Sequence, residues 1–478
     1  MNAKDIFDGV TDIRDDLVGG AGEPPQKRKR WGRRRWLGAV AAVLTVAILG
    51  GVFLRPGGGL TAYAIAQAEY PEMDPYPSGL FQFSDAAYSA WREDVMAQRR
   101  DLGDISPLQD FFARSTQTFL TEKSGENRVY SPLNVYLALS MLAQLTDGNS
   151  RGQILDLLGS GSMDGLRKQA SDVWNSNYRD DGALTSILAG SLWLDKDVKF
   201  KQETMDILAQ DFYASSYRGE MGSDQFNRAL RSWLNEQTGG LLEEQAESIE
   251  LDSDTILALA ATVYFKAKWH SEFLEKNTAV QIFHAPSREV EADFMHQRSS
   301  QRYYWGDKFA AVSQSFEEGG AMWFLLPDEG VSPEELLADT EVMDFLFTAD
   351  KYEWNNQKAL FVNKSIPKFD VSSQFDLEDG LKTLGVTDVF DPMVSDFTPM
   401  TRDVDAPIVI SQASHAARVV IDEEGCTAAA FTVLPAAGAD APPDEEVDFV
   451  LDRPFLFCIT GDSGLPLFVG VVNYPAGE

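Results

Sequence analysis

The succession of helical and strand-like segments restricts this chain to a small set of architectures. Two stretches with amphipathic helical spacing come first, SPLQDFFARSTQTFL at 106–120 and SPLNVYLALSMLAQL at 131–145, and Ser131 followed by Pro132 marks the start of the second. Strand-like runs follow at 187–195, 258–269, 321–327, 359–371, 447–460 and 465–475. Neither a strand–helix–strand rhythm nor an internal repeat links them, so the sequence predicts one α+β domain over residues 104–478.

The charge of the chain is strongly asymmetric. The net charge is −33, and the segment KRKRWGRRR at residues 27–35 carries seven positive charges, so the rest of the chain carries −40. A surface of that sign repels phosphate backbones. We therefore exclude nucleic acid as a partner and attribute the acidity to solubility.

An uncharged run follows the basic segment. Residues 36–54, WLGAVAAVLTVAILGGVFL, would span about 28 Å as a helix, close to the thickness of a bilayer core of about 30 Å. The basic flank places its N-terminal side in the cytoplasm, which predicts a cytoplasmic tail at 1–35, a single transmembrane helix at 36–54 and an extracellular domain. The alternative is a cleaved signal peptide, because small residues recur at 62–68.

The residues between the predicted span and the predicted domain read as a linker. Residues 55–103 are rich in Pro, Gly and Tyr, as in PEMDPYPSG. We expect them to form a juxtamembrane tether.

The residues that usually bind metals or cofactors show no recognisable pattern. The chain has two cysteines, Cys426 and Cys458, and four scattered histidines, without a CxxC, HExxH, Walker or GxGxxG motif. We expect no metal and no cofactor, and the sequence leaves open whether the two cysteines pair.

Two groups of residues suggest proteolytic catalysis, but their sequence surroundings argue against a catalytic role for either. GDSGLP at 461–466 is similar to the nucleophile loop of chymotrypsin-like proteases, but two apolar runs flank Ser463 as they would flank a hairpin turn. His415 and Cys426 could form a thiol protease dyad, but Cys426 follows three acidic residues that disfavour a thiolate. We expect that the protein is not an enzyme.

Five segments carry a family resemblance, in the order in which that family has them. They are NRVYSPLNVYLALSMLAQL, VYFKAKW, FLLPDEG, IPKFDVSSQFDLEDGLKTLGVTDVF and RPFLFCITGDSGLPLFVGVVNYP, and they resemble the serpins over residues 107–475. The resemblance implies three β-sheets, eight or nine helices and an exposed reactive-centre loop. It also implies an inhibitory member, for which we expect a bacterial source.

The stretch IDEEGCTAAAFTVLPAAGADAPP at 421–443 is similar to the serpin hinge and loop. With Gly425 as the hinge, strand alternation directs Cys426, Ala428, Ala430 and Thr432 inward, and all four are small. Phe431 points outward, whereas Pro435 would cost one ladder hydrogen bond and slow entry. The implied hinge residues are Glu423, Glu424, Gly425, Cys426, Thr427, Ala428, Ala429 and Ala430. The implied scissile bond joins Ala439 to Asp440, within a few residues.

The resemblance also assigns single residues of this chain to positions of the serpin family. Trp269 and Lys368 resemble residues where the loop first enters the main sheet, the breach, with Glu423 as the ion partner of Lys368. Ser131 and His415 resemble members of a polar cluster beneath the sheet centre, the shutter. Ala261 and Thr262 stand where the family usually has Asn, and Asn134 is the residue we expect to replace that amide.

The resemblance implies a function. A target serine protease would cleave the loop and form an acyl-enzyme, and the freed loop would enter the sheet and displace the protease. A small residue before the scissile bond favours elastase-like or subtilisin-like targets, since Lys and Arg are absent between Arg418 and Arg453. We expect a monomer. The alternative is a non-inhibitory serpin that acts as a binding protein.

Overall fold

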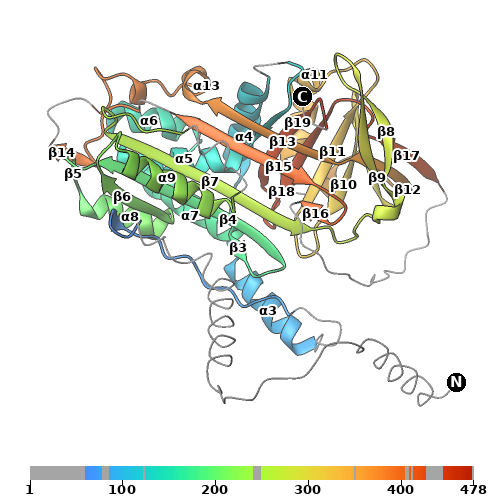
Figure 1. The fold of residues 1–478 in the computed structure, drawn as a ribbon, viewed down its shortest axis with the longest axis horizontal. Helices are drawn as coiled ribbons and strands as arrows, with labels where there is room; N and C mark the ends of the chain where they lie inside the picture. The colour runs from blue at the N-terminus through green and yellow to red at the C-terminus, as the bar shows by residue number, and fades with distance from the viewer. Residues whose placement is uncertain are drawn as a thin grey trace, which may run out of the picture. The chain divides into compact units, whose positions relative to one another are not determined.

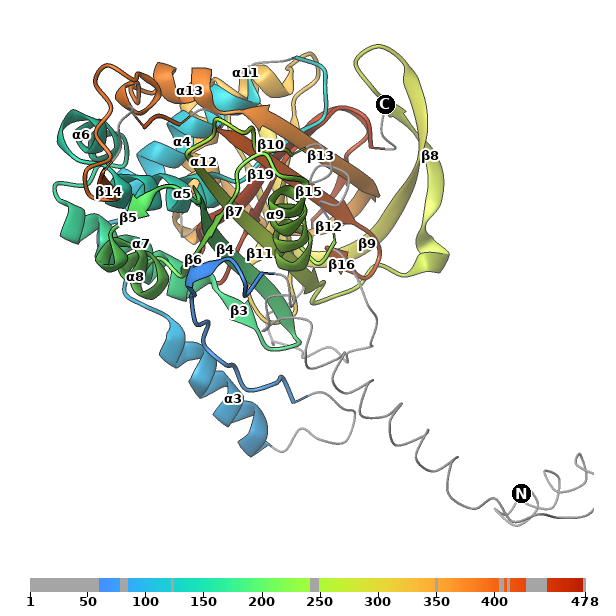
Figure 2. The ribbon, with the colours of Figure 1, turned by 60° about the vertical axis from the view of Figure 1, so that its left-hand side comes forward.

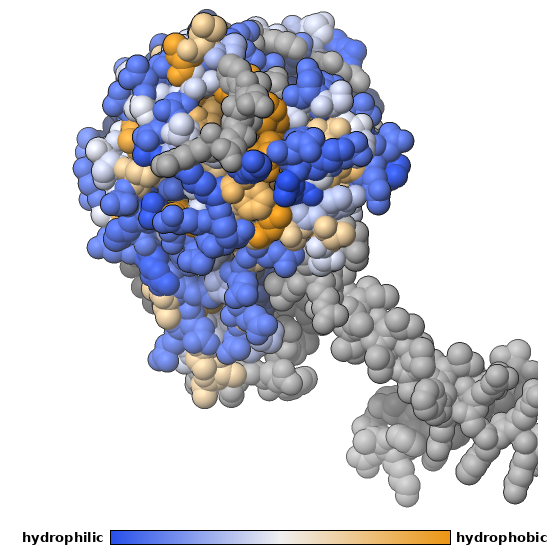
Figure 3. Space-filling view, turned by 90° about the vertical axis from the view of Figure 1, so that its left-hand side faces the viewer, coloured by the Kyte–Doolittle hydropathy of each residue, from blue (hydrophilic) through white to orange (hydrophobic). Residues whose placement is uncertain are grey.

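The computed structural model describes residues 60–77, 85–121, 124–240, 249–348, 351–403, 408–410, 413–426 and 445–475. They belong to one compact unit, Pro56–Glu478. The predicted cytoplasmic tail and transmembrane helix lie outside the described residues. Within the described ranges no helix is long and apolar enough to cross a bilayer. The face in Figure 3 is mostly hydrophilic, interrupted by a hydrophobic strip.

The first sheet has eight strands among the described residues. Their order is β1 (Ala64–Ala66), β6 (Ala214–Gly219), β4 (Leu184–Asp195), β7 (Leu257–Lys268), β16 (Gly425–Cys426), β15 (Ser414–Ile421) and β13 (Phe369–Asp376), with β3 (Arg179–Asp180) paired to β4. Only β4 and β6 pair in parallel; the other pairs are antiparallel. Long strands β7 and β15 cross the middle of the molecule in Figure 1.

The second sheet has nine strands in the described part of the chain, and a third pairs two short ones. The second runs β17 (Glu446–Val450), β12 (Gln357–Pro367), β9 (Glu289–Trp305), β10 (Phe309–Ser315), β11 (Ala321–Pro327), β18 (Phe455–Thr460), β19 (Pro466–Val472) and β2 (Arg128–Tyr130), with β8 (Ala279–His284) on β9. The third joins β14 (Thr401–Asp403) to β5 (Lys199–Phe200). The α+β class and the count of three sheets are confirmed.

Ten α-helices occur among the described residues, more than the eight or nine that we expected, and nine of them lie after Asp104. They are α3 (Asp85–Gln98), α4 (Ser106–Leu120), α5 (Pro132–Leu145), α6 (Gly148–Leu157), α7 (Met163–Asn177), α8 (Gln202–Asp211), α9 (Asp224–Gln237), α11 (Pro333–Leu337), α12 (Thr340–Phe347) and α13 (Glu378–Thr383). Short 3-10 helices also occur, at η1 (Glu275–Asn277), η2 (Lys351–Glu353) and η3 (Asp388–Phe390).

Helix α5 lies in the core between the two large sheets. It contacts β4 and β7 of the first sheet and β19 of the second, and twelve of its residues are buried. Its start is the predicted one, because the Ser131 side chain accepts a hydrogen bond from Asn134 N and Pro132 occupies the first turn. In Figure 2, α4 and α5 lie on the same side of β7 and β15. Helix α9 also contacts β7.

The prediction that residues 55–103 form a tether is wrong for its described part. Strand β1 extends the first sheet by pairing with β6, and Leu60 beside it is buried. Trp91 of α3 is only 4% exposed. The Tyr and Trp residues of this segment bury large apolar rings, and that burial outweighs the flexibility that Pro and Gly suggest. The folded domain therefore begins before Asp104.

Candidate functional site

The middle of the first sheet is interrupted. Strand β16 lies between β7 and β15 at one end only, with Gly425 opposite Lys268 and Cys426 opposite both Ala267 and Ile421. Beyond these two residues, β7 and β15 share no ladder within the described ranges. Four successive β7 residues, 258–261, are only partly buried, whereas a strand of an antiparallel sheet usually buries every second side chain. A further strand could therefore continue from Cys426, between β7 and β15.

The loop that follows β16 lies outside the described residues. These comprise 427–444, including the predicted hinge residues Thr427, Ala428, Ala429 and Ala430 and the predicted scissile pair Ala439 and Asp440. The structure describes the two ends of the loop, Cys426 in β16 and Glu445 before β17. Strand β17 pairs in parallel with β12 of the second sheet, so the loop connects the two large sheets.

Gly425 and Cys426 fit the interior of the sheet closely. A Cβ on Gly425 would approach Ala267 O to 2.2 Å, so only glycine fits without a shift of the backbone. Cys426 is 3% exposed, which agrees with its predicted inward direction, and burial raises the pKa of its thiol to about 12. His415 pairs near the opposite end of β15, about 20 Å along the strand at 3.3 Å per residue. A dyad of His415 with Cys426 is therefore excluded.

Trp269 anchors the chain just before β16. Its indole Nε1 donates to Asp422 O at 2.8 Å, and its backbone N–H donates to Glu424 O at 3.0 Å. The ring stacks on Phe316 with centroids 5.1 Å apart. Trp269 thus holds both sides of the turn that precedes Gly425.

Glu423 and Lys368 form the predicted ion pair. Lys368 Nζ lies 3.1 and 3.2 Å from the two Glu423 carboxylate oxygens, and Thr278 Oγ1 donates to the same carboxylate at 2.7 Å. Burial acts to raise the pKa of Glu423, but hydrogen bonds from Thr278, its own backbone and Lys368 hold it below the ordinary value. The carboxylate is therefore ionised at neutral pH and fixes Glu423 beside the entry end.

A polar cluster beneath the sheet joins β7, β15, α5 and β19. The Ser131 backbone N–H donates to His415 Nε2 at 3.1 Å, and Ser131 Oγ donates to Leu467 O at 2.6 Å. Asn134 Nδ2 donates to Ala261 O of β7 at 3.0 Å. Asn134 thus supplies an amide contact to β7, and its role as a replacement for the family Asn stays a prediction. The structure brings together all three predicted shutter residues.

His415 is expected to make the fold sensitive to acid. Burial lowers its pKa from the ordinary 6.5 to about 4, so the folded protein keeps it neutral while it accepts the Ser131 hydrogen bond. Below about pH 6.5 the unfolded chain binds a proton that the folded chain does not, so stability falls between about pH 6.5 and 4, by roughly 3 kcal/mol. Urea unfolding midpoints from pH 7 to 4.5 measure this loss. His415→Gln should show a shallower pH dependence; an unchanged slope would contradict the assignment.

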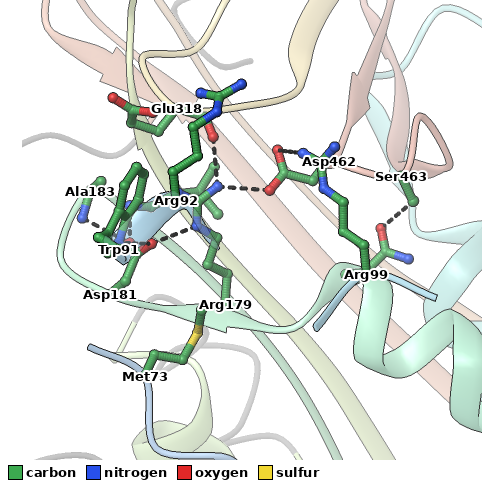
Figure 4. Close-up of polar contacts among 12 residues, drawn as sticks. Met73, Trp91, Arg92, Arg99, Arg179, Asp181, Ala183, Glu318, Asp462 and Ser463 are labelled. Carbon is green, nitrogen blue, oxygen red and sulfur yellow. Dashed lines mark hydrogen bonds and ion pairs between the residues drawn. The ribbon is translucent and has the colours of Figure 1, made fainter. Parts of the chain in front are cut away.

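Ser463 is a turn residue, as expected from the sequence. Its Oγ donates to Asn177 Oδ1 at 2.7 Å and accepts from Leu465 N, within the turn between β18 and β19. Asp462 beside it joins a cluster around Arg179 that the sequence did not predict, shown in Figure 4. The closely spaced aromatic residues Tyr70, Tyr76, Tyr88 and Trp91 were the signal that this region packs.

Comparisons with known proteins agree on one family. A family model described as serpin (serine protease inhibitor) matches residues 107–475. Serpin-ZX of Arabidopsis thaliana is 29% identical over 374 residues, which cover 74% of this chain and 94% of that protein. The native state of the thermophilic serpin Tengpin has a similar fold, with TM-score 0.70, 22% identity and coverage of 79% and 96%. Human thyroxine-binding globulin complexed with its ligand is similar too, with TM-score 0.66, 22% identity and coverage of 78% and 98%.

Proposed function

The chain belongs to the serpin family, and we propose that it inhibits serine proteases by inserting its cleaved loop as a strand between β7 and β15. One observation carries this proposal: β16 already lies between β7 and β15, and these strands share no other ladder among the described residues. The chain that continues β16 is the row of small residues after Cys426. Insertion would extend an existing strand and would not start a new one.

The chemistry of inhibition belongs to the target protease. Its serine attacks the carbonyl of the scissile bond, the C-terminal half of the loop leaves as an amine, and the N-terminal half stays bound as an ester. Residues from Thr427 onward then pair with β7 and β15. Entry carries the bound protease from one end of the sheet toward the other, which distorts its active site before water can hydrolyse the ester.

The residues around the proposed scissile bond favour proteases with shallow specificity pockets. Ala439 precedes the bond and Asp440 follows it, and Ala436 to Ala441 are neighbouring candidates. A trypsin-like enzyme would need Lys or Arg, and the chain has neither between Arg418 and Arg453. Elastase-like or subtilisin-like enzymes are therefore the proposed targets.

The protein is expected to remain attached to the membrane, with its folded domain outside the cell, because residues 36–54 match one bilayer thickness after a basic flank. The position of β1 supports this over a cleaved signal peptide, since the small-residue sites at 62–68 overlap a strand paired with β6. Membrane fractionation and N-terminal sequencing measure the outcome. A soluble mature protein that begins near Ile65 or Tyr70 would contradict the anchor.

A bacterial source and a monomeric state also stay predictions.

The alternative is a non-inhibitory serpin that binds a ligand. Its support is the structural likeness to thyroxine-binding globulin, which was solved with thyroxine. At 22% identity that likeness shows the fold alone. The small residues at the inward positions of the hinge favour inhibition, because we expect a non-inhibitory member to lose them.

A denaturing gel tests the proposed function. The folded domain is mixed with elastase-like and subtilisin-like proteases, and inhibition gives a band near the summed mass that survives detergent and heat. Peptide mass spectrometry of that band locates the ester. Cleaved protein without a covalent band, for every protease tried, would support the non-inhibitory alternative.

A further inference from the structure

The segment first predicted to be a tether forms a strap. We define the strap as the described residues of 70–77 and 85–103, which include α3. Tyr70 packs against Trp174 and Tyr178 with ring centroids 5.5 Å apart, and Tyr76 packs edge-on against Trp91 at 4.9 Å. The backbone N–H of Tyr76 donates to Asp181 O at 2.7 Å. The strap is thus held by aromatic packing and by the backbone just after β3.

A buried arginine from β3 lies beneath α3. Arg179 Nε donates to Asp181 Oδ2 at 2.6 Å, and the guanidinium lies 5.1 Å from the Trp91 ring centroid. Trp91 Nε1 donates to the same carboxylate oxygen at 3.2 Å. Figure 4 shows Trp91, Asp181 and Arg179 pointing toward one another. This contact fixes α3 on the first sheet.

The same cluster reaches two hairpin turns of the second sheet. Arg179 Nη1 donates to Glu318 O at 2.6 Å, in the turn between β10 and β11, and to Asp462 Oδ2 at 2.7 Å, in the turn between β18 and β19. Tyr88 OH of α3 donates to Glu318 Oε2 at 3.4 Å, and Arg99 Nη2, just after α3, lies 3.4 Å from Asp462 Oδ1. The strap therefore ties β3 of the first sheet to both turns of the second.

The turn that carries Glu318 also contacts the entry end of the first sheet. Glu317 N donates to Lys268 O at 2.9 Å, and Lys268 is the β7 residue opposite Gly425. Phe316 stacks on Trp269, which holds the backbone of Asp422 and Glu424. Direct contacts thus run from α3 through this turn to the start of β16.

Entry of a full strand fixes the separation of β7 and β15. An inserted strand sets them at two strand spacings, about 9.6 Å, along their whole length. Strands β3, β4 and β6 are paired in one block with β7, so any adjustment of β7 moves β3 relative to the second sheet. The 2.7 Å ion pair of Arg179 with Asp462 and the 2.6 Å hydrogen bond from Arg179 to Glu318 O join β3 to the two turns and resist that movement.

We propose that the strap restrains loop entry, so that weakening its links to the second sheet speeds insertion of the uncut loop. This regulation rests on the proposed inhibitory function. The strap stabilises the arrangement in which, of the residues that the structure describes, only Gly425 and Cys426 stand between β7 and β15. A ligand or a protease that released α3 would shorten the time for which the protein stays able to inhibit.

A double variant, Tyr88→Phe with Arg99→Gln, tests the strap. It removes two side-chain links from the strap to the second sheet and leaves Trp91, Asp181 and Arg179 in place. Met96→Ala is the matched control, because Met96 lies on the same helix and is 47% exposed. Circular dichroism checks that each variant is folded. Trp91→Phe is a second variant, which weakens the same attachment without a change of charge.

The readout is spontaneous conversion of the uncut protein at 37 °C, followed as resistance to unfolding on a urea-gradient gel. The double variant should convert on the order of tenfold faster than the unaltered protein, within the range expected for mutations along a coupled network. Met96→Ala should match the unaltered protein. Equal conversion rates for the double variant and Met96→Ala would overturn the proposal that the strap restrains loop entry. Because this gel needs no protease, a failure of covalent complex formation by the unaltered protein would count against the proposed function separately.

Discussion

Replacement of Ala430 by arginine is expected to turn the protein from an inhibitor into a substrate. Cys426 is buried between β7 and β15, and strand alternation places residues 428 and 430 on the same inward face once the loop continues β16. A charged side chain there would enter the interior without a partner, at a cost of at least several kcal/mol. Entry then becomes slower than hydrolysis of the acyl-enzyme, so the protease is released.

The matched control is Ala429→Arg, one residue away on the outward face. The family resemblance implies that both positions lie in an exposed loop of the uncut protein, so neither substitution should change its stability by more than about 0.5 kcal/mol. Covalent complex yield against one small-pocket protease compares the two. Near-complete loss for Ala430→Arg and near-normal yield for Ala429→Arg are the expected results. Equal yields would mean that the register is wrong.

Cleavage of the loop is expected to raise thermal stability. Residues 427–434 would each gain ladder bonds worth about 1 kcal/mol, and their apolar side chains would add burial. At a few degrees per kcal/mol or less for a domain of this size, the melting temperature should rise by roughly 10 °C or more. Pro435 should end this gain, since it cannot donate to a ladder.

Differential scanning calorimetry before and after limited proteolysis measures this shift. The same digest of Ala430→Arg is the control, because that loop is cut but blocked from entry. Its midpoint should stay close to that of the uncut protein. A lowered or unchanged midpoint for the unaltered protein would favour the non-inhibitory alternative.

The sequence predicted the parts of this fold that depend on neighbouring residues. The start of α5 follows from Ser131 and Pro132, and the turn at Ser463 follows from the apolar runs around it. The family resemblance, rather than residue spacing, paired Lys368 with Glu423 and grouped Ser131 with His415. The structure places both pairs in contact. Their roles in loop entry stay predictions.

The partners of the strap could not be predicted because they are distant in sequence. Arg99 and Asp462 are separated by 363 positions, and Tyr88 meets Glu318 across 230. Pro and Gly are common in linkers, whereas closely spaced aromatic residues indicate packing, so the composition of this segment gives opposing signals. The buried Arg179 carried no signal of its own, since its partners come from the turns of another sheet.

Hydrogen exchange of β7 and β15 tests the insertion account most directly. In the uncut protein these strands share no ladder among the described residues beyond Gly425 and Cys426, so many amides that face the interruption should exchange quickly. After cleavage by a small-pocket protease, peptides that cover Leu257–Lys268 and Ser414–Ile421 should become protected by orders of magnitude, because the inserted loop pairs with both strands. Unchanged exchange in both peptides after complete cleavage would contradict insertion at this site.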